Sequence, residues 1–512
     1  MPPLTADQLA TLQSMQLRVE SKIAASPALS QQLGFIGTYL VNSESQLIAL
    51  MNGTAPPSGG DIEFGMVLYW IHNDLPSILQ WMAKYFPPTQ ITAALYAQWQ
   101  NTWATTGVIA PDGTMVADGP FSQLDKGWFY SSILYVLKLF GEVTTATQGP
   151  APQPITLPNN PTLTIALLGD WGTGPWSDCG SPAPAVTIMQ QLESLSPPPD
   201  IVIHVGDVYY SGAGHLPWAV TIAMMALSLK TGVPFYPNEE DLRLVQQWWS
   251  TGPKPMPRSF TLNSNHESYS GSNGYFGDAL TSSLFTSQGK TSYFALYYQD
   301  WAIVGLDSAL YSTSIFNMQG ALQNSADSSQ VAWAKGLNLT GKNVIALTHH
   351  TALSIDGQPI PGSLLSSDGN PIPPNKLYSD MHAALNNQDP DYWYWGHTHN
   401  GVVYNTNATM SSSGKTTTLC RCLGHAAIPF GDAYYWQNGT KYSLGQSPTV
   451  DYYAHSAVPN PTGCAQQTLR VKNGFAVITL AQGTITESFY EQGNTTPVWT
   501  SGMVSLATKA MK

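Results

Sequence analysis

The sequence predicts a layered α/β domain that follows a separate helical domain. Residues 1–146 place apolar side chains at helical spacing, residues 147–161 are rich in proline, and residues 162–505 alternate short apolar runs with helix-like segments. Alternating strands and helices are typical of α/β domains, and a proline-rich stretch is typical of a linker. We therefore expect an N-terminal all-helical domain (1–146), a linker (147–161) and a C-terminal α/β domain (162–505).

Composition and charge exclude several classes of function. The 512 residues contain 32 acidic and 20 basic side chains, which gives a net charge of -12. Nucleic acids and anionic membranes attract basic surfaces, so we expect no nucleic-acid partner. No apolar run is long enough for a transmembrane segment, and the start at Met1-Pro2-Pro3 shows no signal peptide. We expect a protein that is cytoplasmic or exported by a route that needs no signal peptide.

The N-terminal region contains several helical patterns. Thr5-Ala6-Asp7-Gln8 has the spacing of a helix-capping box, and further patterns cover residues 31–51, 62–86, 89–103 and 127–140. Their many Trp and Tyr residues indicate a helix-bundle core, with a partner-binding or membrane-docking surface as the alternative. The region shows no recognisable chemistry, and its protein partner stays open.

Apolar runs of strand length begin after the proline-rich stretch. We expect a helix over residues 185–195, two antiparallel strands at 475–480 and 484–490, and earlier strands at 162–168, 201–205, 258–262, 293–306, 344–347 and 392–395. Two insertions, 213–257 and 351–375, interrupt this order. Long loops beside strand ends often select substrates.

Polar side chains stand where five of these apolar runs end. The segments are Asp170, Asp207 with Tyr210, Asn265-His266-Glu267, His349-His350 and His397-Thr398-His399. A single polar residue at a strand end usually has a structural role, but five such segments would cluster groups that are costly to bury without partners. Carboxylate, imidazole, amide and phenol groups are ligands of hard to borderline metal ions. The pattern therefore indicates two metal ions that share one carboxylate, and Asp207 suits that bridging position.

These segments resemble the motifs of the calcineurin-like metallophosphoesterases, and most resemble those of the purple acid phosphatases. The motifs are Gly169-Asp170-Trp171-Gly172, Gly206-Asp207-Val208-Tyr209-Tyr210, Asn265-His266-Glu267, His349 and Gly396-His397-Thr398-His399. They cover residues 170–400, and the N-terminal 145 residues lie outside them. The resemblance implies a four-layer sandwich of two mixed β-sheets flanked by helices.

The resemblance also implies the ligand sets. Asp170, Asp207, Tyr210 and His399 would hold the first metal, and Asp207, Asn265, His349 and His397 would hold the second. His266 would assist at the phosphoryl group or the leaving group, with Glu267 orienting it. His350 is the alternative to His349, and His425 is a further candidate for lining the site.

One position departs from the wider superfamily, which has a histidine two residues after the first aspartate. Here that residue is Gly172, and Tyr210 would supply the missing ligand, as the resemblance to purple acid phosphatases implies. Because a phenolate stabilises a trivalent ion, we expect Fe(III) in the first site and a divalent ion (Fe, Zn or Mn) in the second. Residues 351–375 contain no histidine, so the leaving-group acid stays open.

The resemblance implies an enzyme that hydrolyses phosphate monoesters by attack of a metal-bridged hydroxide on phosphorus. The substrate would be a small phosphate ester or a phosphorylated molecule. A phosphodiesterase or nucleotide hydrolase on the same metals is one alternative. A secreted effector or binding protein that acts through its N-terminal helical module is an alternative of another class.

Overall fold

The computed structural model describes seven continuous ranges of the chain. They are residues 141–174, 182–221, 239–353, 375–408, 418–428, 448–459 and 469–506, together with scattered residues before 140 and a few short pieces between the ranges. The predicted helices at 31–51, 62–86 and 89–103, and most of the 351–375 insertion, lie outside the described residues.

A six-stranded sheet carries the first three of the predicted strands that end in polar residues. Its order is β20-β19-β18-β4-β5-β6. The strands β4 (Leu163–Leu168), β5 (Ile201–His204) and β6 (Arg258–Thr261) run parallel. The strands β18 (Gly474–Ala481), β19 (Thr484–Glu491) and β20 (Trp499–Ser505) continue the sheet in antiparallel order. This outcome confirms the predicted antiparallel strands near the end of the chain.

An eight-stranded sheet carries the other two, and its order is β15-β11-β12-β10-β9-β8-β7-β3. Four of its strands run parallel at the centre: β8 (Trp301–Gly305), β9 (Asn343–Leu347), β10 (Tyr392–Trp395) and β12 (Leu419–Leu423). The others are β3 (Ile155–Thr156), β7 (Phe294–Tyr298), β11 (Gly401–Tyr404) and β15 (Val450–Tyr453). Both sheets are therefore mixed, as expected.

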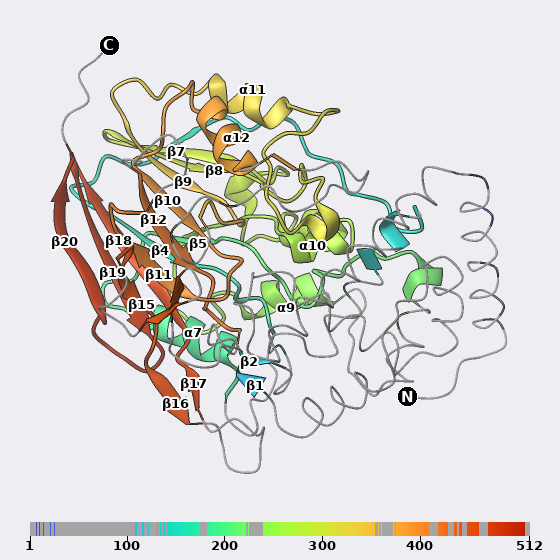
Figure 1. Cartoon of the computed structure of the whole chain (residues 1–512), viewed down its shortest axis with the longest axis horizontal. Helices are drawn as coiled ribbons and strands as arrows, with labels where there is room; N and C mark the ends of the chain where they lie inside the picture. Colours follow the sequence, from blue (N-terminus) through green and yellow to red (C-terminus); the bar gives the residue numbers. More distant parts are fainter. Residues whose placement is uncertain are drawn as a thin grey trace.

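The two sheets pack face to face and helices cover the outside (Figure 1). Alternate residues of β4 show the layering, because Ile165 and Leu167 belong to the core between the sheets while Ala166 and Leu168 face the helix side. The helices α7 (Pro184–Glu193) and α9 (Glu240–Gln247) contribute to the second of these cores, and α11 (Ser329–Lys335) and α12 (Lys376–Ala384) contribute to the first. The result is the expected four-layer sandwich.

Short elements complete the described chain. The helix α10 (Asn265–Tyr269) follows β6, and shorter helical turns occupy Tyr275–Ala279, Thr286–Gln288 and Ile315–Asn317. Two small hairpins pair β13 (Tyr435–Gln437) with β14 (Thr440–Tyr442) and β16 (Ala457–Pro459) with β17 (Leu469–Val471).

Two predicted elements differ from the observed ones. The run 293–306 forms two antiparallel strands, β7 and β8, because the chain reverses at Gln299, where φ is +49°. The proline-rich stretch predicted as a linker packs on the domain instead: its β3 pairs with β7, and Leu157 N donates to Tyr297 O. Proline is tolerated there because an edge strand uses only one side of its backbone for pairing.

The described residues of the N-terminal region are not all helical. A two-residue pair, β1 (Val108–Ile109) and β2 (Met115–Val116), is antiparallel, whereas the described residues between 131 and 139 are helical as predicted. Some of these residues contact the catalytic domain, since Ser131 Oγ donates to Tyr210 O and Lys138 Nζ donates to Ser268 O. Within the described part of the chain, no helix has the length and apolar character needed to cross a membrane.

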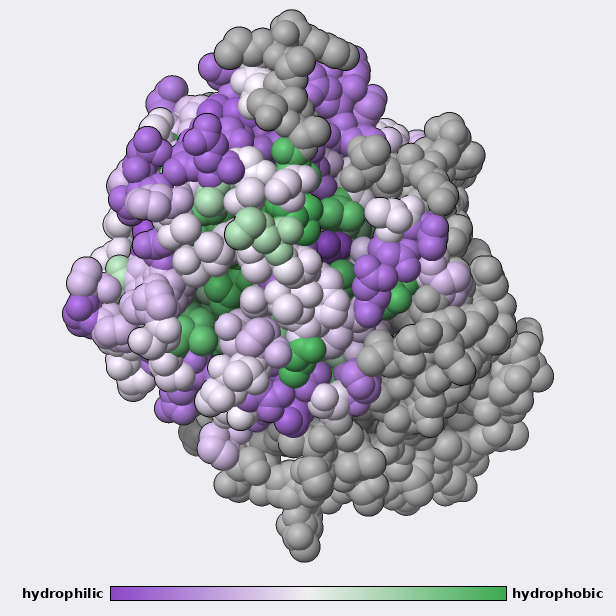
Figure 2. Space-filling view, turned by 90° about the vertical axis from the view of Figure 1, so that its left-hand side faces the viewer, coloured by the Kyte–Doolittle hydropathy of each residue, from purple (hydrophilic) through white to green (hydrophobic). Residues whose placement is uncertain are grey.

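The face on the β20 side carries small, separate hydrophobic groups among hydrophilic residues (Figure 2). Met503 and Val498 are its large exposed apolar side chains, 76% and 37% exposed. Such isolated groups are ordinary for a soluble surface and do not form a wide apolar patch.

Candidate metal centre

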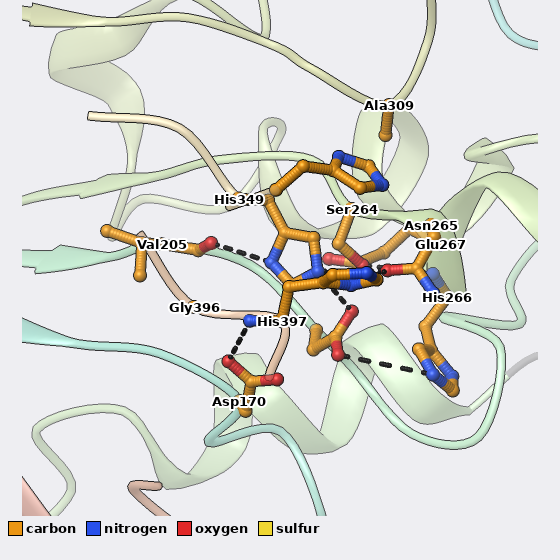
Figure 3. Close-up of polar contacts among 12 residues, drawn as sticks. Asp170, Val205, Ser264, Asn265, His266, Glu267, Ala309, His349, Gly396 and His397 are labelled. Atoms are coloured by element: carbon orange, nitrogen blue, oxygen red, sulfur yellow. Dashed lines mark hydrogen bonds and ion pairs between the residues drawn. The ribbon is translucent and has the colours of Figure 1, made fainter. Parts of the chain in front are cut away.

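The polar strand ends of both sheets meet at one place. Asp170 follows β4, Asp207 follows β5, and Asn265 begins α10 directly after β6. From the other sheet, His349 follows β9, and His397 and His399 lie between β10 and β11. Parallel strands present their carboxyl ends at the same edge, which brings these distant residues together. Figure 3 shows Asn265, His349 and His397 converging from different elements.

The first group consists of Asp170, Asp207 and His399. One ligand atom from each lies within 4.8 Å of the others, and all three side chains are buried. His399 Nε2 is 3.2 Å from Asp170 Oδ1 and 3.7 Å from Asp207 Oδ2. Two carboxylates and an imidazole at this separation can hold one metal ion.

The second group consists of His349, Asn265 and His397. Asn265 Oδ1 lies 2.9 Å from His349 Nε2 and 3.2 Å from His397 Nδ1. His349 Nε2 also lies 3.1 Å from Asp207 Oδ1, and its Nδ1 is 3.0 Å from Val205 O. The backbone carbonyl holds one ring nitrogen, so the other faces the group.

The donor set suits a cation. Asp207 Oδ1 is fully buried and has no hydrogen-bond partner of acceptable geometry, although His349 Nε2 is near. Burial and the Asp207 carboxylate raise the pKa of Asp170 to about 6. Burial alone would also raise the pKa of Asp207, but His349 and His266 hold it well below its ordinary value. Two adjacent buried carboxylates and an unsatisfied oxygen are costly without a positive charge, so a metal ion fits here.

His399 supplies part of that charge in the metal-free protein. Burial opposes its protonation, but hydrogen bonds with Asp170 and Asp207 raise its pKa to about 10. A bound cation would take over the role of this proton, because a metal-ligating imidazole must be neutral.

The backbone of the site is strained at four of the predicted ligands. Asp170, Asp207, His397 and His399 all have positive φ, between +52° and +75°. Gly206, with φ +103°, has no room for a side chain, because a Cβ there would lie 2.7 Å from His349 Nδ1. Such conformations cost about 1–3 kcal/mol each and cluster at functional sites.

The tyrosine hydroxyl that faces this group is that of Tyr209, whereas the hydroxyl of Tyr210, the predicted ligand, lies elsewhere. The Tyr209 hydroxyl lies 2.6 Å from Asp207 Oδ2, 3.1 Å from Asp170 Oδ1 and 2.8 Å from His399 Nε2. The Tyr210 hydroxyl instead accepts a hydrogen bond from Phe121 N at 3.0 Å, and its ring stacks on Phe121 with centroids 4.5 Å apart. Both tyrosines lie in the turn that follows Val208, and only Tyr209 directs its hydroxyl to the carboxylates.

Gly172 has no room for the side chain that the wider superfamily has at this position. It forms an isolated parallel bridge with Val208, and a Cβ at Gly172 would lie 2.7 Å from Val208 Cα. No histidine side chain fits at that position. The same bridge fixes the segment that leads into Tyr209, whose N donates to Gly172 O.

Glu240 is a functional residue that the sequence patterns did not identify. Its carboxylate accepts hydrogen bonds from the backbone N–H groups of Tyr210, Ser211 and Ala213, each at 2.8 Å. Burial raises its pKa to about 7 against the opposing effect of these donors. Glu240 is the first residue of α9 and lies inside the 213–257 insertion. No sequence pattern in that insertion indicated its contact with residues 210–213. It holds the loop that carries both tyrosines.

His266 lies beside the first group. Its Nδ1 is 2.5 Å from Tyr210 O, and its Nε2 is 4.0 Å from Asp207 Oδ2. Burial lowers its pKa to about 4. Glu267 Oε2 accepts hydrogen bonds from Val208 N and Ser264 Oγ, and burial and Asp207 raise the pKa of Glu267 well above its usual range. The Tyr210 carbonyl thus orients His266, while Glu267 holds the backbone next to Asp207.

His350 and His425 lie behind the site. Both His350 ring nitrogens have partners, since Nδ1 is 2.8 Å from Ser308 Oγ and Nε2 is 2.6 Å from Asn317 O. His349 is therefore the residue of this pair that faces Asp207. His425 packs between Gly401 and Gly474, and burial lowers its pKa to about 4.

Comparison with known proteins indicates the class of the α/β domain. Residues 163–401 match the family model of the calcineurin-like phosphoesterases. The match lies on the segment that carries the ligand groups and supports a phosphoesterase. This family implies a dinuclear metal site, and the buried group around Asp207 stands where such a site belongs.

Solved structures with a similar fold include three proteins. A purple acid phosphatase from yellow lupin (Lupinus luteus) seeds is 12% identical, with a TM-score of 0.40 over 69% of this chain and 55% of its own. GAP50, the anchor in the inner membrane complex of Plasmodium, is 12% identical, with a TM-score of 0.36 over 68% and 91%. PhoD is 11% identical, with a TM-score of 0.37 over 69% and 70%. The chain thus spans little more than half of the lupin enzyme's length. A search of curated protein sequences found no match.

Proposed function

We propose that this protein is a dinuclear-metal phosphatase that hydrolyses phosphate monoesters. The observation that carries the proposal is the position of Asp207 between two groups of ligands. Its Oδ2 faces Tyr209 and His399, and its Oδ1 faces His349. A carboxylate with its two oxygens turned to different ligand sets is suited to bridge two ions.

Each ion would have its own ligands in addition to Asp207. Asp170, Tyr209 and His399 would hold the first ion, and Asn265, His349 and His397 would hold the second. The metals, when bound, supply positive charge for the phosphoryl oxygens and activate water as a nucleophile.

Tyr209 supports Fe(III) in the first position. Burial and the two carboxylates raise the pKa of this phenol well above its ordinary value in the metal-free protein. A strongly charged cation is needed to stabilise the phenolate against that environment. We therefore assign a trivalent ion to the first position and a divalent ion, Fe, Zn or Mn, to the second.

The protein's own residues orient the substrate and handle a proton. The Tyr210 carbonyl holds His266 Nδ1, which turns Nε2 toward the Asp207 side, where it can exchange a proton with the phosphoryl or leaving-group oxygen. His397 is half-buried, whereas Asp170, Asp207 and His399 are at most 2% exposed. Ligands buried this deeply are easier to reach for a terminal phosphate group than for an internal diester, which supports a monoester.

Paired kinetics test this proposal. The purified protein, loaded with iron and zinc, is assayed with p-nitrophenyl phosphate and with bis(p-nitrophenyl) phosphate, and its metal content is measured. We expect two metals per chain and a larger kcat/KM for the monoester. One metal per chain, or a preference for the diester, would refute the corresponding part of the proposal.

A further inference from the structure

A cavity of about 200 Å³ lies between the N-terminal helical residues and the catalytic domain. None of its lining residues belongs to the candidate metal centre. Besides Tyr135, Leu139 and Leu310, the lining has one cation and a set of hydroxyl and amide groups: Lys138, Thr145, Ser268, Ser312, Thr313, Ser314 and Asn317. Thr313 is exposed, so the cavity is reached from solvent.

Lys138 is the unusual member of this lining. Its Nζ donates to Ser268 O at 2.6 Å and lies 5.0 Å from the centre of the Tyr135 ring. Among the residues that the structure describes, no carboxylate pairs with this ammonium group. Burial lowers the pKa of Lys138 to about 8, so most of the charge persists at neutral pH. A half-buried cation is normally paired, and the chain has an excess of acidic residues that could have supplied a partner.

The remaining lining groups suit an oxyanion. The hydroxyls of Ser312 and Ser314 already donate to Gln319 O, so the exposed Thr313 between them is the hydroxyl of this loop that is turned to the mouth of the cavity. Lysine is a common phosphate ligand, and hydroxyl groups donate to phosphate oxygens. A cavity of about 200 Å³ is smaller than a typical drug-sized site, which begins at roughly 300 Å³. Its size fits a phosphate group rather than a large organic ligand.

The cavity is connected to the metal centre by hydrogen bonds. Ser268 lies in α10, the helix that begins with Asn265 and His266. Asn317 Nδ2 donates to Ser268 Oγ at 2.7 Å, and Asn317 O is 2.6 Å from His350 Nε2. The His350 ring packs against His397, with centroids 4.7 Å apart. A ligand in the cavity would thus contact residues that support the metal ligands.

We infer that this cavity is a second phosphate site, in which the ammonium of Lys138 and the hydroxyl of Thr313 bind a phosphate group apart from the metal centre. The site goes beyond the proposed hydrolysis and does not need the metals. Two sources share this chemistry: free orthophosphate and a second phosphate on the substrate.

Equilibrium binding of inorganic phosphate to the metal-loaded full-length protein tests the site. We expect two phosphates per chain in the wild type, and one in either Lys138→Met or Asp207→Asn. Removal of a charge-assisted hydrogen bond costs about 1.5–3 kcal/mol, so the Lys138→Met affinity should fall by roughly ten- to a hundredfold. Lys138→Arg should restore it. A Lys138→Met protein that binds as many phosphates, with the same affinities, as the wild type overturns the inference.

Lys342→Met is a matched control. Lys342 Nζ donates to Gln299 O at 3.1 Å and lies 5.1 Å from the Tyr297 ring centre, so its contacts resemble those of Lys138 but it does not line the cavity. This variant should keep both phosphates. Thr313→Glu is a second test that leaves the interior intact, because Thr313 is exposed at the mouth of the cavity. The new carboxylate should repel phosphate and weaken its binding as strongly as Lys138→Met does.

Kinetics separate the two sources of phosphate. If free orthophosphate is the ligand, it lowers kcat of the wild type and not of Lys138→Met, in addition to competing at the metals. If the substrate provides it, KM rises in Lys138→Met for a bisphosphorylated substrate and stays constant for a monophosphorylated one. If the proposed metal centre is wrong, the Asp207→Asn protein should still bind the phosphate that depends on Lys138. The proposed function and the proposed second phosphate site can therefore be refuted independently.

Discussion

The pair Tyr209 and Tyr210 offers the sharpest test of the site, because the two residues are adjacent and chemically identical. Only the Tyr209 hydroxyl lies against Asp170, Asp207 and His399. Tyr209→Phe and Tyr210→Phe each remove one oxygen atom and keep the ring. The two variants therefore differ in which contacts they lose and in little else.

The structure predicts effects of different kind for the two variants. A hydrogen bond to a charged group contributes about 1.5–3 kcal/mol, so Tyr209→Phe should weaken metal retention by roughly ten- to a hundredfold. Tyr210→Phe removes the hydrogen bond that Phe121 N donates to the Tyr210 hydroxyl, which costs about 0.5–1.5 kcal/mol of folding stability. We expect its metal content to stay unchanged.

Metal analysis, visible absorption and urea unfolding of the iron-loaded proteins distinguish these outcomes. Tyr209→Phe should lose the tyrosinate-to-iron charge-transfer band, and Tyr210→Phe should keep it and unfold at lower urea. If Tyr210→Phe removes the band and Tyr209→Phe keeps it, the assignment of Tyr209 is refuted and the spacing rule of the purple acid phosphatases holds. If neither variant changes the band, no phenolate binds the metal.

Three further predictions follow from the same contacts. Chelation of the metals should lower the melting temperature of the wild type, because Asp170 and Asp207 then lie together without a cation. It should have little effect on the melting temperature of Asp207→Asn. Equal shifts of the two proteins in differential scanning fluorimetry would contradict the bridging role of Asp207. Glu240→Gln places an amide NH₂ against the backbone N–H donors of the loop that carries Tyr209 and Tyr210. We expect kcat to fall by roughly tenfold while the metal content stays unchanged. An unaltered kcat would show that Glu240 does not position this loop. The pKa of Lys138 is lowered to about 8, so between pH 8 and the usual lysine pKa the folded wild type binds fewer protons than the unfolded chain. The stability of the wild type relative to Lys138→Met should therefore rise by about 1–2 kcal/mol across that pH window, allowing for partial exposure of the side chain. A stability difference in urea unfolding that stays constant with pH would contradict the burial of this charge.

Much of the fold and most of the candidate site could be predicted from local patterns. Apolar runs that end at Asp170, Asp207 and Asn265 mark strands of a parallel sheet, and such strands present their carboxyl ends together. The same reasoning predicted that His349, which follows β9, and His397 and His399, which follow β10, lie at the carboxyl ends of strands. Short-range patterns sufficed here because both strand period and strand termination are local properties of the chain.

The hairpin β7–β8 and the edge strand β3 show where local patterns fail. The run from 293 to 306 is interrupted only by Gln299 and Asp300 and carries no glycine or proline at its turn, and the second strand of the reversal packs on β9. The proline-rich stretch resembles a linker in composition, yet an available edge of the sheet binds it. Both outcomes depend on partners far away in the sequence.

By itself, the sequence determined the α/β class, the order of the catalytic strands and the residue types that end them, because these depend on side-chain periodicity and turn chemistry. Only the tertiary structure decided which tyrosine faces the carboxylates. The bridge between Gly172 and Val208, the three hydrogen bonds to Glu240 and the contact of Phe121 with Tyr210 together turn Tyr209 inward. Tyr209 and Tyr210 are the same residue type and lie two and three positions after Asp207. Only contacts with residues distant in the sequence therefore distinguish them.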